Sequence, residues 1–245
     1  MAETTTTTTT AAAAASAQQP PPFQVTGRTF DPFHSPRLTY RSLEETPEDE
    51  AIVRTLLSDL EARTGASYML TRPASKAQAQ KYLEEAQDDL ICVVICLKPP
   101  PASDDATKAE PAPASPVPVG VVSLSTTGSG SRTQLFAQHR GCYLGVDVLR
   151  AHRGRGYGAE AIEWVTGYAF QMANMHRVMV NTLSYNGGAM RLYRRLGFVE
   201  EGRQREDAWF DGGWHDSVYY SMLEGEWRGR QEEGRGWKWG EGCRD

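Results

Sequence analysis

The segment with the clearest chemical potential is VLRAHRGRGYGAEA, residues 148–161, which places glycines and arginines between an apolar run and a helical pattern. Glycine lets the backbone approach an anion closely. The first N–H groups of a helix lack intrahelical partners and carry positive partial charge. The segment therefore predicts a phosphate-binding turn with Arg153 and Arg155 as further donors, and a plain strand-to-helix turn is the alternative.

The spacing of these glycines excludes two common phosphate motifs. They stand at positions 154, 156 and 158, whereas the dinucleotide fingerprint needs G-x-G-x-x-G and the P-loop needs Gly-Lys-Ser/Thr. Any phosphate held here belongs to another class of ligand.

A second segment, SYNGGAMRLYRRLGFVEEG, also combines a helix with polar groups. Asn186 has the residue type of an N-cap and Gly197 that of a helix stop. Between them Tyr193 lies on an apolar face. On its own this pattern favours a capped helix with a core aromatic residue.

The elements that must position these two segments follow from periodicity. Short β-rich runs and helical spacings alternate, with several strands preceding a strand–helix–strand–helix–strand order, which predicts an α+β fold with a mixed sheet. Asp211-Gly212 predicts the turn of a hairpin over residues 208–223. Strands are expected at residues 37–41, 90–97, 117–125, 142–149 and 177–183, and helices at 47–64, 75–86, 156–174 and 187–196.

Composition places limits on the class of protein. The formal net charge of -5 argues against a nucleic-acid partner. No apolar stretch has the length of about 20 residues that spans a bilayer, and the N-terminus lacks the features of a secretory signal. The four cysteines show no metal-ligand spacing, so we expect reduced thiols and no metal site. We predict no membrane partner and a cytoplasmic location, with the nucleus as the alternative.

Low-complexity segments suggest how the chain is divided. Residues 1–34 begin with Thr, Ala and Pro runs and are predicted to be a disordered leader. Residues 98–118 are rich in Pro and Ala and are expected to form a long loop. Residues 228–245 are Gly-rich and charged and are predicted to be a flexible tail. One domain over residues 35–227 remains.

In this order, the two segments resemble the GNAT superfamily of N-acetyltransferases. Its pyrophosphate signature, Arg/Gln-x-x-Gly-x-Gly/Ala, matches Arg153, Gly156 and Gly158. Its later signature matches Asn186, Tyr193 and the Leu-Gly-Phe at 196–198. The opening SPRLTYRSL, the segment EEGRQRE and the closing DGGWHDSVYYSMLEGEW resemble the branch that contains the ribosomal-protein alanine acetyltransferases. The resemblance covers residues 35–227.

The resemblance implies the α+β GNAT fold: a mixed, mostly antiparallel sheet flanked by helices, with two splayed parallel strands at the CoA site. It implies acetyl-CoA as co-substrate and an amine as acceptor. The backbone near Val148 would hold the pantetheine and polarise the thioester, Asn186 would contact the CoA chain, and Tyr193 would lie near the sulfur. The pyrophosphate would be bound by Arg153, Gly154, Arg155, Gly156, Tyr157 and Gly158.

Attack of an amine on a thioester requires two proton transfers. A phenol near the sulfur can protonate the leaving thiolate, so Tyr193 is the predicted general acid. An alkyl ammonium has a pKa of about 10, so a base is also needed. Asp147 is the candidate base, because it alternates away from the apolar residues of its strand. His176, His215 and a water relay are the alternatives.

The acceptor stays open between a small molecule, an amino acid and a protein N-terminus, with a small amine favoured. A non-catalytic acyl-CoA-binding module is the alternative function. We expect a monomer or a homodimer.

Overall fold

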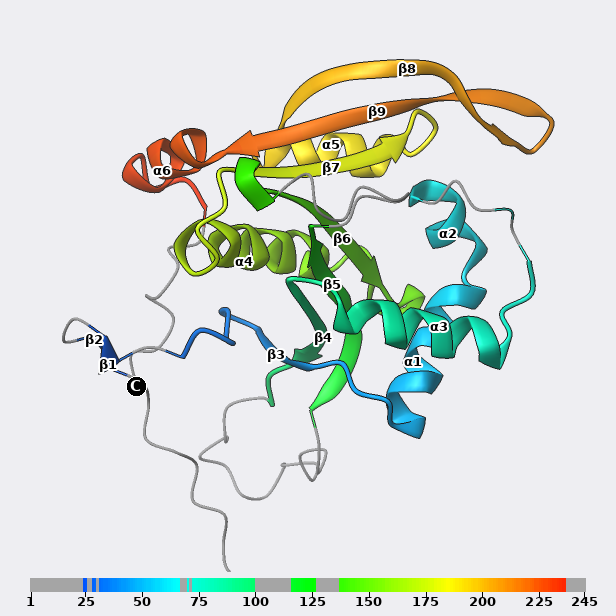
Figure 1. Ribbon diagram of the computed structural model, residues 1–245, viewed down its shortest axis with the longest axis horizontal. Helices are drawn as coiled ribbons and strands as arrows, with labels where there is room; N and C mark the ends of the chain where they lie inside the picture. The colour runs from blue at the N-terminus through cyan, green and yellow to red at the C-terminus, as the bar shows by residue number, and fades with distance from the viewer. Residues whose placement is uncertain are drawn as a thin grey trace, which may run out of the picture.

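The computed structural model describes residues 24–25, 28–29, 31–66, 70, 72–99, 116–126 and 137–236. A main sheet of seven strands runs in the order β3-β4-β5-β6-β7-β9-β8 (Figure 1). Its strands are β3 (Leu38–Ser42), β4 (Ile91–Leu97), β5 (Val117–Ser125), β6 (Gly141–Val148), β7 (Arg177–Leu183), β8 (Val199–Phe210) and β9 (Gly213–Leu223).

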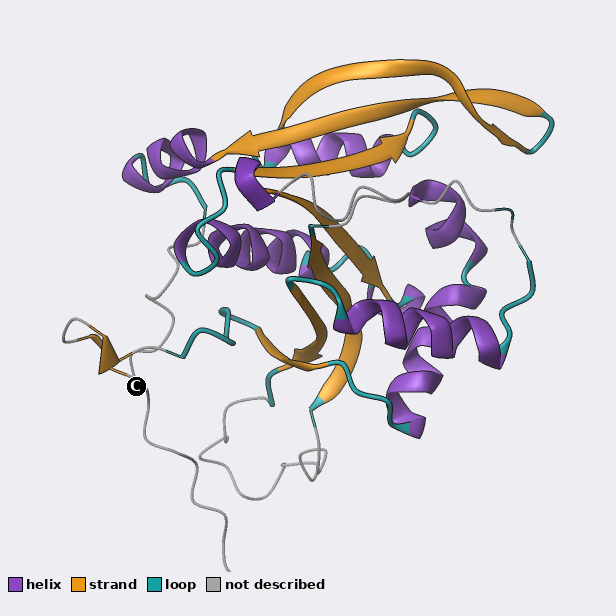
Figure 2. Ribbon diagram, viewed as in Figure 1, coloured by secondary structure: helices purple, strands orange, loops and turns teal. Residues whose placement is uncertain are grey.

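Helices lie on both faces of this sheet (Figure 2). A separate pair, β1 (Gln24–Val25) and β2 (Arg28–Thr29), forms a two-stranded sheet of its own. The helices are α1 (Pro47–Ser58), α2 (Leu60–Ala66), α3 (Lys76–Gln87), α4 (Tyr157–Gln171), α5 (Gly187–Arg195) and α6 (Glu224–Glu232), with 3-10 turns η1 (Ala137–His139) and η2 (Arg150–His152).

The alternation of side chains along β4 divides the core into two layers. Val93 and Ile95 join a cluster that includes residues of α4, α5 and α6. Val94 and Cys96 join the cluster built by α1 and α3. Apolar residues on both sides explain why β4 and β5 are almost continuously hydrophobic rather than alternating.

One pair of neighbouring strands sets up the functional region. All adjacent strands of the main sheet pair antiparallel except β6 and β7, which are parallel. Their pairing covers only residues 141–143 of β6 and 177–179 of β7. Beyond these residues the two strands diverge, so the predicted mixed sheet with splayed parallel strands is confirmed.

The helix predicted over residues 47–64 is wrong in its continuity. It breaks at Asp59, whose φ of -80° and ψ of 101° are extended. The Asp59 carboxylate accepts a hydrogen bond from the N–H of Ala62, as an N-cap does, and so begins α2. Apolar periodicity does not reveal such a break, because the spacing of the leucines continues across it.

The predicted Asn186 cap, Asp211-Gly212 turn and Gly197 helix stop are confirmed, whereas the helix predicted to residue 174 ends at Gln171. Ser75 caps α3 with a capping box, and Asn186 caps α5 through its Oδ1. Asp211 and Gly212 both have positive φ, 48° and 76°, as a tight hairpin turn between β8 and β9 requires. Gly197 ends the α5 region with a φ of 91°.

The described part of the chain extends beyond the predicted domain at both ends. The backbone carbonyl of Pro32 accepts a hydrogen bond from the indole of Trp164, within the span predicted as leader. Helix α6 continues past Trp227 to Glu232. Most of the predicted leader, residues 100–115 of the Pro-rich loop and the end of the tail lie outside the described residues.

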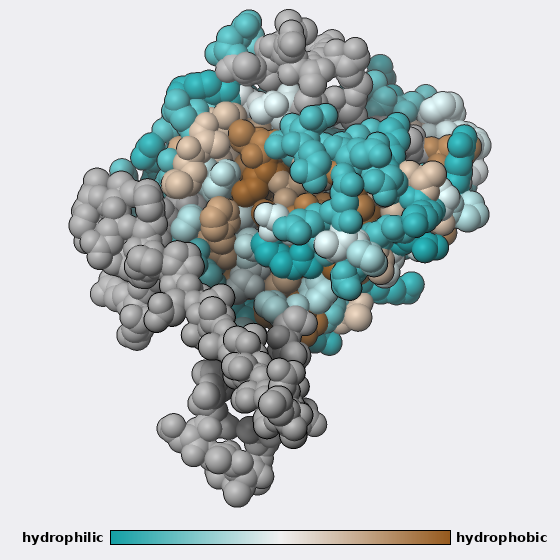
Figure 3. Space-filling view, turned by 60° about the horizontal axis from the view of Figure 1, so that its bottom comes forward, coloured by the Kyte–Doolittle hydropathy of each residue, from teal (hydrophilic) through white to brown (hydrophobic). Residues whose placement is uncertain are grey.

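Across the part of the chain that the structure describes, no helix combines the length and apolarity needed to cross a membrane. On the face shown in Figure 3, hydrophobic residues are interspersed among hydrophilic ones.

Candidate functional site

The glycine-rich turn between β6 and α4 has the backbone that its residues allow. Gly154 and Gly156 have φ values of 74° and 84°, in the left-handed region that favours glycine. Gly156 is the N-cap of α4, and the N–H of Glu160 donates to its carbonyl oxygen over 3.1 Å. The N–H groups that precede Glu160 in the first turn therefore have no intrahelical acceptor and can bind an anion.

A brace from a distant part of the sequence holds this turn. The carboxylate of Glu160, in the first turn of α4, accepts hydrogen bonds from Ser35 Oγ and from the N–H of Arg37, each over 2.7 Å. Arg37 Nε donates to the same carboxylate over 2.7 Å, and its Nη1 donates to the carbonyl of Arg155 over 3.0 Å. Sequence reasoning missed this brace, because nothing local pairs position 37 with position 160.

A cavity of about 770 Å³ opens at the glycine-rich turn. Arg191 and Arg195 of α5 add positive charge to its wall, and Arg194 instead pairs with Glu200. Two of the three arginines of α5 thus lie at the glycine-rich turn, and the third does not. The cavity is lined by Val148, His152, Arg153, Gly154, Gly156, Tyr157, Gly158, Ala159, Gly188, Arg191, Leu192 and Arg195.

A second cavity, of about 480 Å³, continues from the first into the splay between β6 and β7. The two cavities share Val148, Arg153, Gly158 and Leu192. The second is lined by Glu61, Ala62, Thr64, Gly65, Val146, Asp147, Val148, Arg153, Gly158, Tyr185, Asn186, Ala189, Leu192, Tyr193 and Phe210. The predicted phosphate turn, Tyr193 and Asp147 therefore border one continuous groove.

Tyr193 contributes to both the groove and the core. It is 6% exposed and packs against Phe198 and Tyr220, with ring centroids 6.1 and 5.7 Å away. Burial raises the pKa of its phenol, and the nearby Asp147 and Tyr220 raise it further. The phenol therefore stays protonated at neutral pH and can donate a proton.

Asp147 lies on the wall opposite the α4 core. Cys142 and Leu144 of the same strand face that core, and Leu149 packs with the α1–α3 cluster, so alternation directs Asp147 toward the α1–α3 side. Burial raises the pKa of its carboxyl, against the lowering effect of the guanidinium groups of Arg153 and Arg63. A carboxylate with a raised pKa is a stronger base than an exposed one.

The side chains of Asn186 and Arg153 are engaged by α2 and its N-cap. Asn186 Nδ2 donates to the carbonyl of Gly65 over 3.3 Å. Arg153 Nη2 lies 2.8 Å from Asp59 Oδ2, and Nη1 lies 3.4 Å from Glu61 Oε2. The α2 residues were not among the sequence candidates, since they carry no motif and reach the groove only in the folded chain.

The two histidines considered as bases lie outside the lining of both cavities. His215 meets the ring of Tyr185 edge-on, with centroids 4.6 Å apart, and its Nε2 lies 3.2 Å from the carbonyl of Phe210. His176 is exposed at the start of β7. Phe210 is the member of the hairpin aromatics that lines the groove, whereas Trp209 and Trp214 are exposed.

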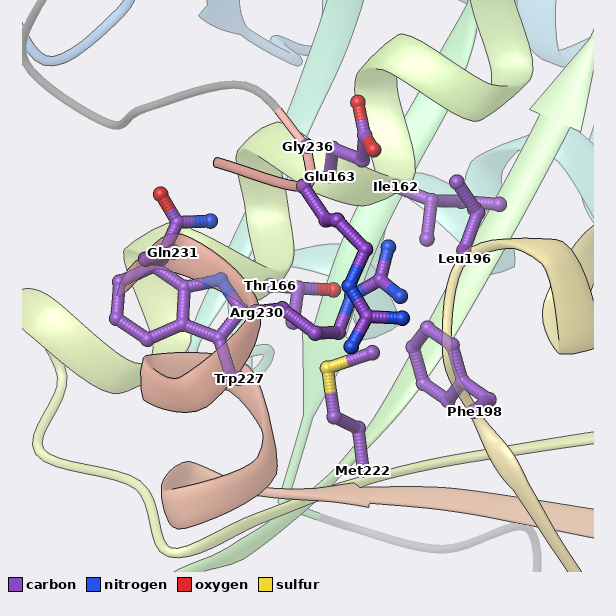
Figure 4. Close-up of a pocket in the computed structure, with 11 residues that line it drawn as sticks. Ile162, Glu163, Thr166, Leu196, Phe198, Met222, Trp227, Arg230, Gln231 and Gly236 are labelled. Carbon is purple, nitrogen blue, oxygen red and sulfur yellow. The ribbon is translucent and has the colours of Figure 1, made fainter. Parts of the chain in front are cut away.

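A small crevice elsewhere is formed between α4 and α6 (Figure 4). Its volume is about 20 Å³, which suits a single water molecule rather than a substrate. The side chain of Arg230 passes across it, and Thr166 Oγ1 lies buried at its wall without a hydrogen-bond partner among the described residues. Within the same described ranges, no group of three or more His, Cys, Asp or Glu side chains is placed to hold a metal ion.

The chain is similar to known acetyltransferases. A family model described as an acetyltransferase (GNAT) domain matches residues 37–199. A putative ribosomal N-acetyltransferase of Bacillus subtilis is 31% identical over 44% of this chain and 58% of its own length. A ribosomal protein uS5 alanine N-acetyltransferase of Escherichia coli is 29% identical over 44% of this chain and 53% of its own. The chain thus spans about half the length of the curated relatives it matches.

Solved structures support the fold. A spermidine N-acetyltransferase from Vibrio cholerae, in complex with CoA and spermine, superposes with a TM-score of 0.59 at 20% identity, over 78% of this chain and 98% of that one. A GNAT-family acetyltransferase from Bacillus anthracis superposes with a TM-score of 0.58 at 16% identity, over 79% of this chain and 98% of that one.

Proposed function

Because the chain belongs to the GNAT acetyltransferase family, we propose that it transfers the acetyl group of acetyl-CoA directly to a primary amine while both substrates are bound. The observation that carries this proposal is the continuous groove. It joins the glycine-rich turn to the splay between β6 and β7, where Tyr193 and Asp147 both line the wall.

The residues of the turn suit an acyl-CoA. The backbone from Arg153 to Gly158 binds the pyrophosphate, since two left-handed glycines expose N–H groups at the N-terminus of α4. Arg191 and Arg195 line the same cavity and attract the phosphate on the ribose of CoA. Val148 ends β6 where the two cavities meet. Asn186 lies on the wall of the second cavity, which is the inner one, so these two residues hold the pantetheine chain.

A bound thioester supplies an activated acyl group, and the protein manages the protons. In the reaction the C–N bond forms as the C–S bond breaks, one proton leaves the amine and one is needed by the sulfur. Tyr193 donates the proton to the sulfur, because its buried phenol is held protonated. Asp147 accepts the proton from the amine, directly or through a water molecule, because its burial makes it more basic.

The lining of the second, inner cavity supports an amine as acceptor. The carboxyl groups of Glu61 and Asp147 line it, together with the aromatic rings of Tyr185 and Phe210. Carboxylates attract an ammonium group, and aromatic faces accept a cation or an apolar chain. A small amine fits this wall best, with an amino acid or a protein N-terminus as the other acceptors. Among the relatives, one enzyme is named for spermidine, a small amine, and another for an alanine of a ribosomal protein.

A non-catalytic acyl-CoA-binding module is the second candidate. It is favoured by the packing of Tyr193 in the core, which explains the residue without a chemical role.

We also propose that the protein acts in the cytoplasm, with the nucleus as the alternative, as a monomer or a homodimer. The thiols of Cys92, Cys96 and Cys142 form no disulfide with one another, which supports a reducing compartment.

The test is release of free CoA thiol from acetyl-CoA in the presence of spermidine, single amino acids, aryl-alkyl amines and a short peptide with N-terminal alanine. Turnover with one class and mass-spectrometric detection of its N-acetyl product would establish the transferase and its acceptor. Calorimetric binding of acetyl-CoA without turnover on the whole panel would favour the binding module. An absence of binding would refute both.

A further inference from the structure

The guanidinium group of Arg153 connects the two halves of the groove. Its Nε donates to the backbone carbonyl of Val148 over 2.9 Å. Its Nη2 lies 2.8 Å from Asp59 Oδ2, and its Nη1 lies 3.4 Å from Glu61 Oε2. Each of the three guanidinium nitrogens thus faces an oxygen atom of β6 or of the start of α2, and the side chain is 28% exposed.

Asp59, which pairs with Arg153, is held in its ionised form by the groups around it. Its Oδ1 accepts the N–H of Ala62 over 3.2 Å, which caps α2. Burial acts to raise the pKa of this carboxyl, but the Ala62 N–H and the Arg153 guanidinium together bring it below its ordinary value. The ion pair therefore persists at neutral pH, and it joins the first residues of α2 to the glycine-rich turn.

The C-terminal end of α2 is hydrogen-bonded to Thr182 of β7 and to residues that follow this strand. The carbonyl of Gly65 accepts hydrogen bonds from Thr182 Oγ1, over 2.9 Å, and from Asn186 Nδ2, over 3.3 Å. The hydroxyl of Tyr185 donates to the carbonyl of Thr64. A helix of seven residues is too short to be stable alone, so these hydrogen bonds set its position. Between its ends, α2 supplies the Glu61, Ala62, Thr64 and Gly65 wall of the inner cavity.

We propose that the side chain of Arg153 is a positioning residue for the acceptor amine, and that the backbone rather than this side chain serves the pyrophosphate. By joining Asp59 to the carbonyl of Val148, Arg153 holds the α2 wall at a fixed distance from the strand that bears Asp147. The acceptor amine is thereby held between α2 and β6. This inference rests on the transferase activity proposed above.

The geometry distinguishes this role from direct binding of phosphate. If the guanidinium binds pyrophosphate, its removal lowers the affinity of the protein for acetyl-CoA, whatever its neighbours are. If the guanidinium positions α2, its removal weakens binding of the acceptor, and removal of the Asp59 carboxylate has the same effect. Asn at position 59 keeps a side chain suited to the N-cap while removing the charge, so Asp59→Asn isolates the ion pair.

The experiment compares Arg153→Met, Asp59→Asn and the double variant with the wild-type protein, using the acceptor of fastest turnover from the amine panel. We expect each single variant to raise KM for the acceptor about tenfold, the order expected when a reactant is less well positioned. The calorimetric Kd for acetyl-CoA should stay within about twofold. The double variant should be no worse than Arg153→Met, because both changes remove one interaction.

Exposed residues provide matched controls. Arg54→Met on α1 and Glu84→Gln on α3 make the same kinds of charge change, on side chains that line neither cavity. Both should behave as wild type, and thermal unfolding of every variant shows whether the fold is kept.

Two other results would be decisive. A large rise in the Kd for acetyl-CoA with Arg153→Met, accompanied by a silent Asp59→Asn, would overturn the positioning role and leave the transferase intact. An absence of turnover in the wild-type protein with every acceptor would instead overturn the transferase itself, and with it the acceptor role of Arg153.

Discussion

Arg37 and Glu160 form an ion pair with an Nε–Oε2 distance of 2.7 Å at the base of the glycine-rich turn. The Glu160 side chain is only 10% exposed, and the same arginine also holds the carbonyl of Arg155. The residue just before β3 thus fixes the conformation of a turn that lies more than a hundred residues later in the chain.

Removal of this brace should weaken cofactor binding. We expect Arg37→Met to raise the Kd for acetyl-CoA about tenfold, because the turn must then be ordered at the expense of binding energy. The value of kcat at saturating acetyl-CoA should change little. Isothermal titration and steady-state kinetics measure the two effects, and Arg54→Met, at an exposed arginine of α1 that lines neither cavity, is the control. A fall in kcat alone would contradict the interpretation.

Two glycines of the turn should respond differently to alanine. Gly156 has a φ of 84°, and an added Cβ would lie 3.2 Å from Arg37 Nη2. At Gly158 the nearest atom is Val148 Cγ2, at 3.4 Å, an ordinary contact. Gly156→Ala should therefore lower both acetyl-CoA affinity and stability, by about 1 kcal/mol for the backbone strain. Gly158→Ala should have a smaller effect on both. Equal effects of the two variants on stability would show that the positive φ is not required.

Tyr193→Phe separates chemistry from packing. The phenyl ring preserves most contacts in the core, but the proton donor is lost, so we expect kcat to fall by a factor of about 100 or more. The Kd for acetyl-CoA should be retained. Tyr220→Phe is the control, because Tyr220 packs against the same ring, donates to Glu200, and does not line the groove. Unchanged turnover of Tyr193→Phe, with or without lost stability, would show that the residue is structural.

Asp147 should determine the acidic side of the pH profile. Because burial raises the pKa of its carboxyl, kcat/KM should fall as the pH drops through a value above the ordinary 3.9 or so of an aspartate. Asp147→Asn should remove this dependence and lower kcat/KM about 100-fold. Asp89 also has a carboxyl whose pKa is raised by burial, but it lies outside the groove, so Asp89→Asn should keep the wild-type acidic limb. If Asp89→Asn also lost the fall of kcat/KM at acidic pH, that fall would have to be assigned to a group other than Asp147.

Acid should destabilise the α1 side of the molecule through Asp49. Its carboxylate is hydrogen-bonded by both Nη atoms of Arg41, over 2.9 and 2.6 Å, and by the N–H of Glu44. Burial favours the neutral acid, but these donors lower the pKa below its ordinary value. The stabilisation is therefore complete above the unfolded-state pKa of about 3.9 and is lost as the pH falls through the lower folded-state value.

Asp49→Asn should lower the free energy of unfolding at neutral pH by about 1–3 kcal/mol, and the difference from wild type should shrink in acid. Urea unfolding at neutral and acidic pH measures both quantities. Glu48→Gln, on the exposed side of the same helix turn, is the control. A difference that grew with acidity would have the wrong sign for a carboxylate stabilised in the folded state.

The sequence by itself determined the local geometry of the site. Left-handed glycines at 154 and 156, the Asn186 cap, the Gly197 stop and the Asp211-Gly212 hairpin turn all depend on backbone preferences that a residue carries within its own neighbourhood. The apolar periods of the strands and helices are local too, which is why the α+β fold could be predicted from them.

Only the tertiary structure decided what those elements face. The ion pair that turns Arg153 toward α2 and the brace between Arg37 and Glu160 both join residues far apart in sequence. Such contacts arise when burial brings charged groups together and each must then find a partner away from water. A long polar side chain has many directions available, and packing selects one of them. The sequence therefore located the glycine-rich turn, and the folded chain supplied the α2 wall of the second cavity.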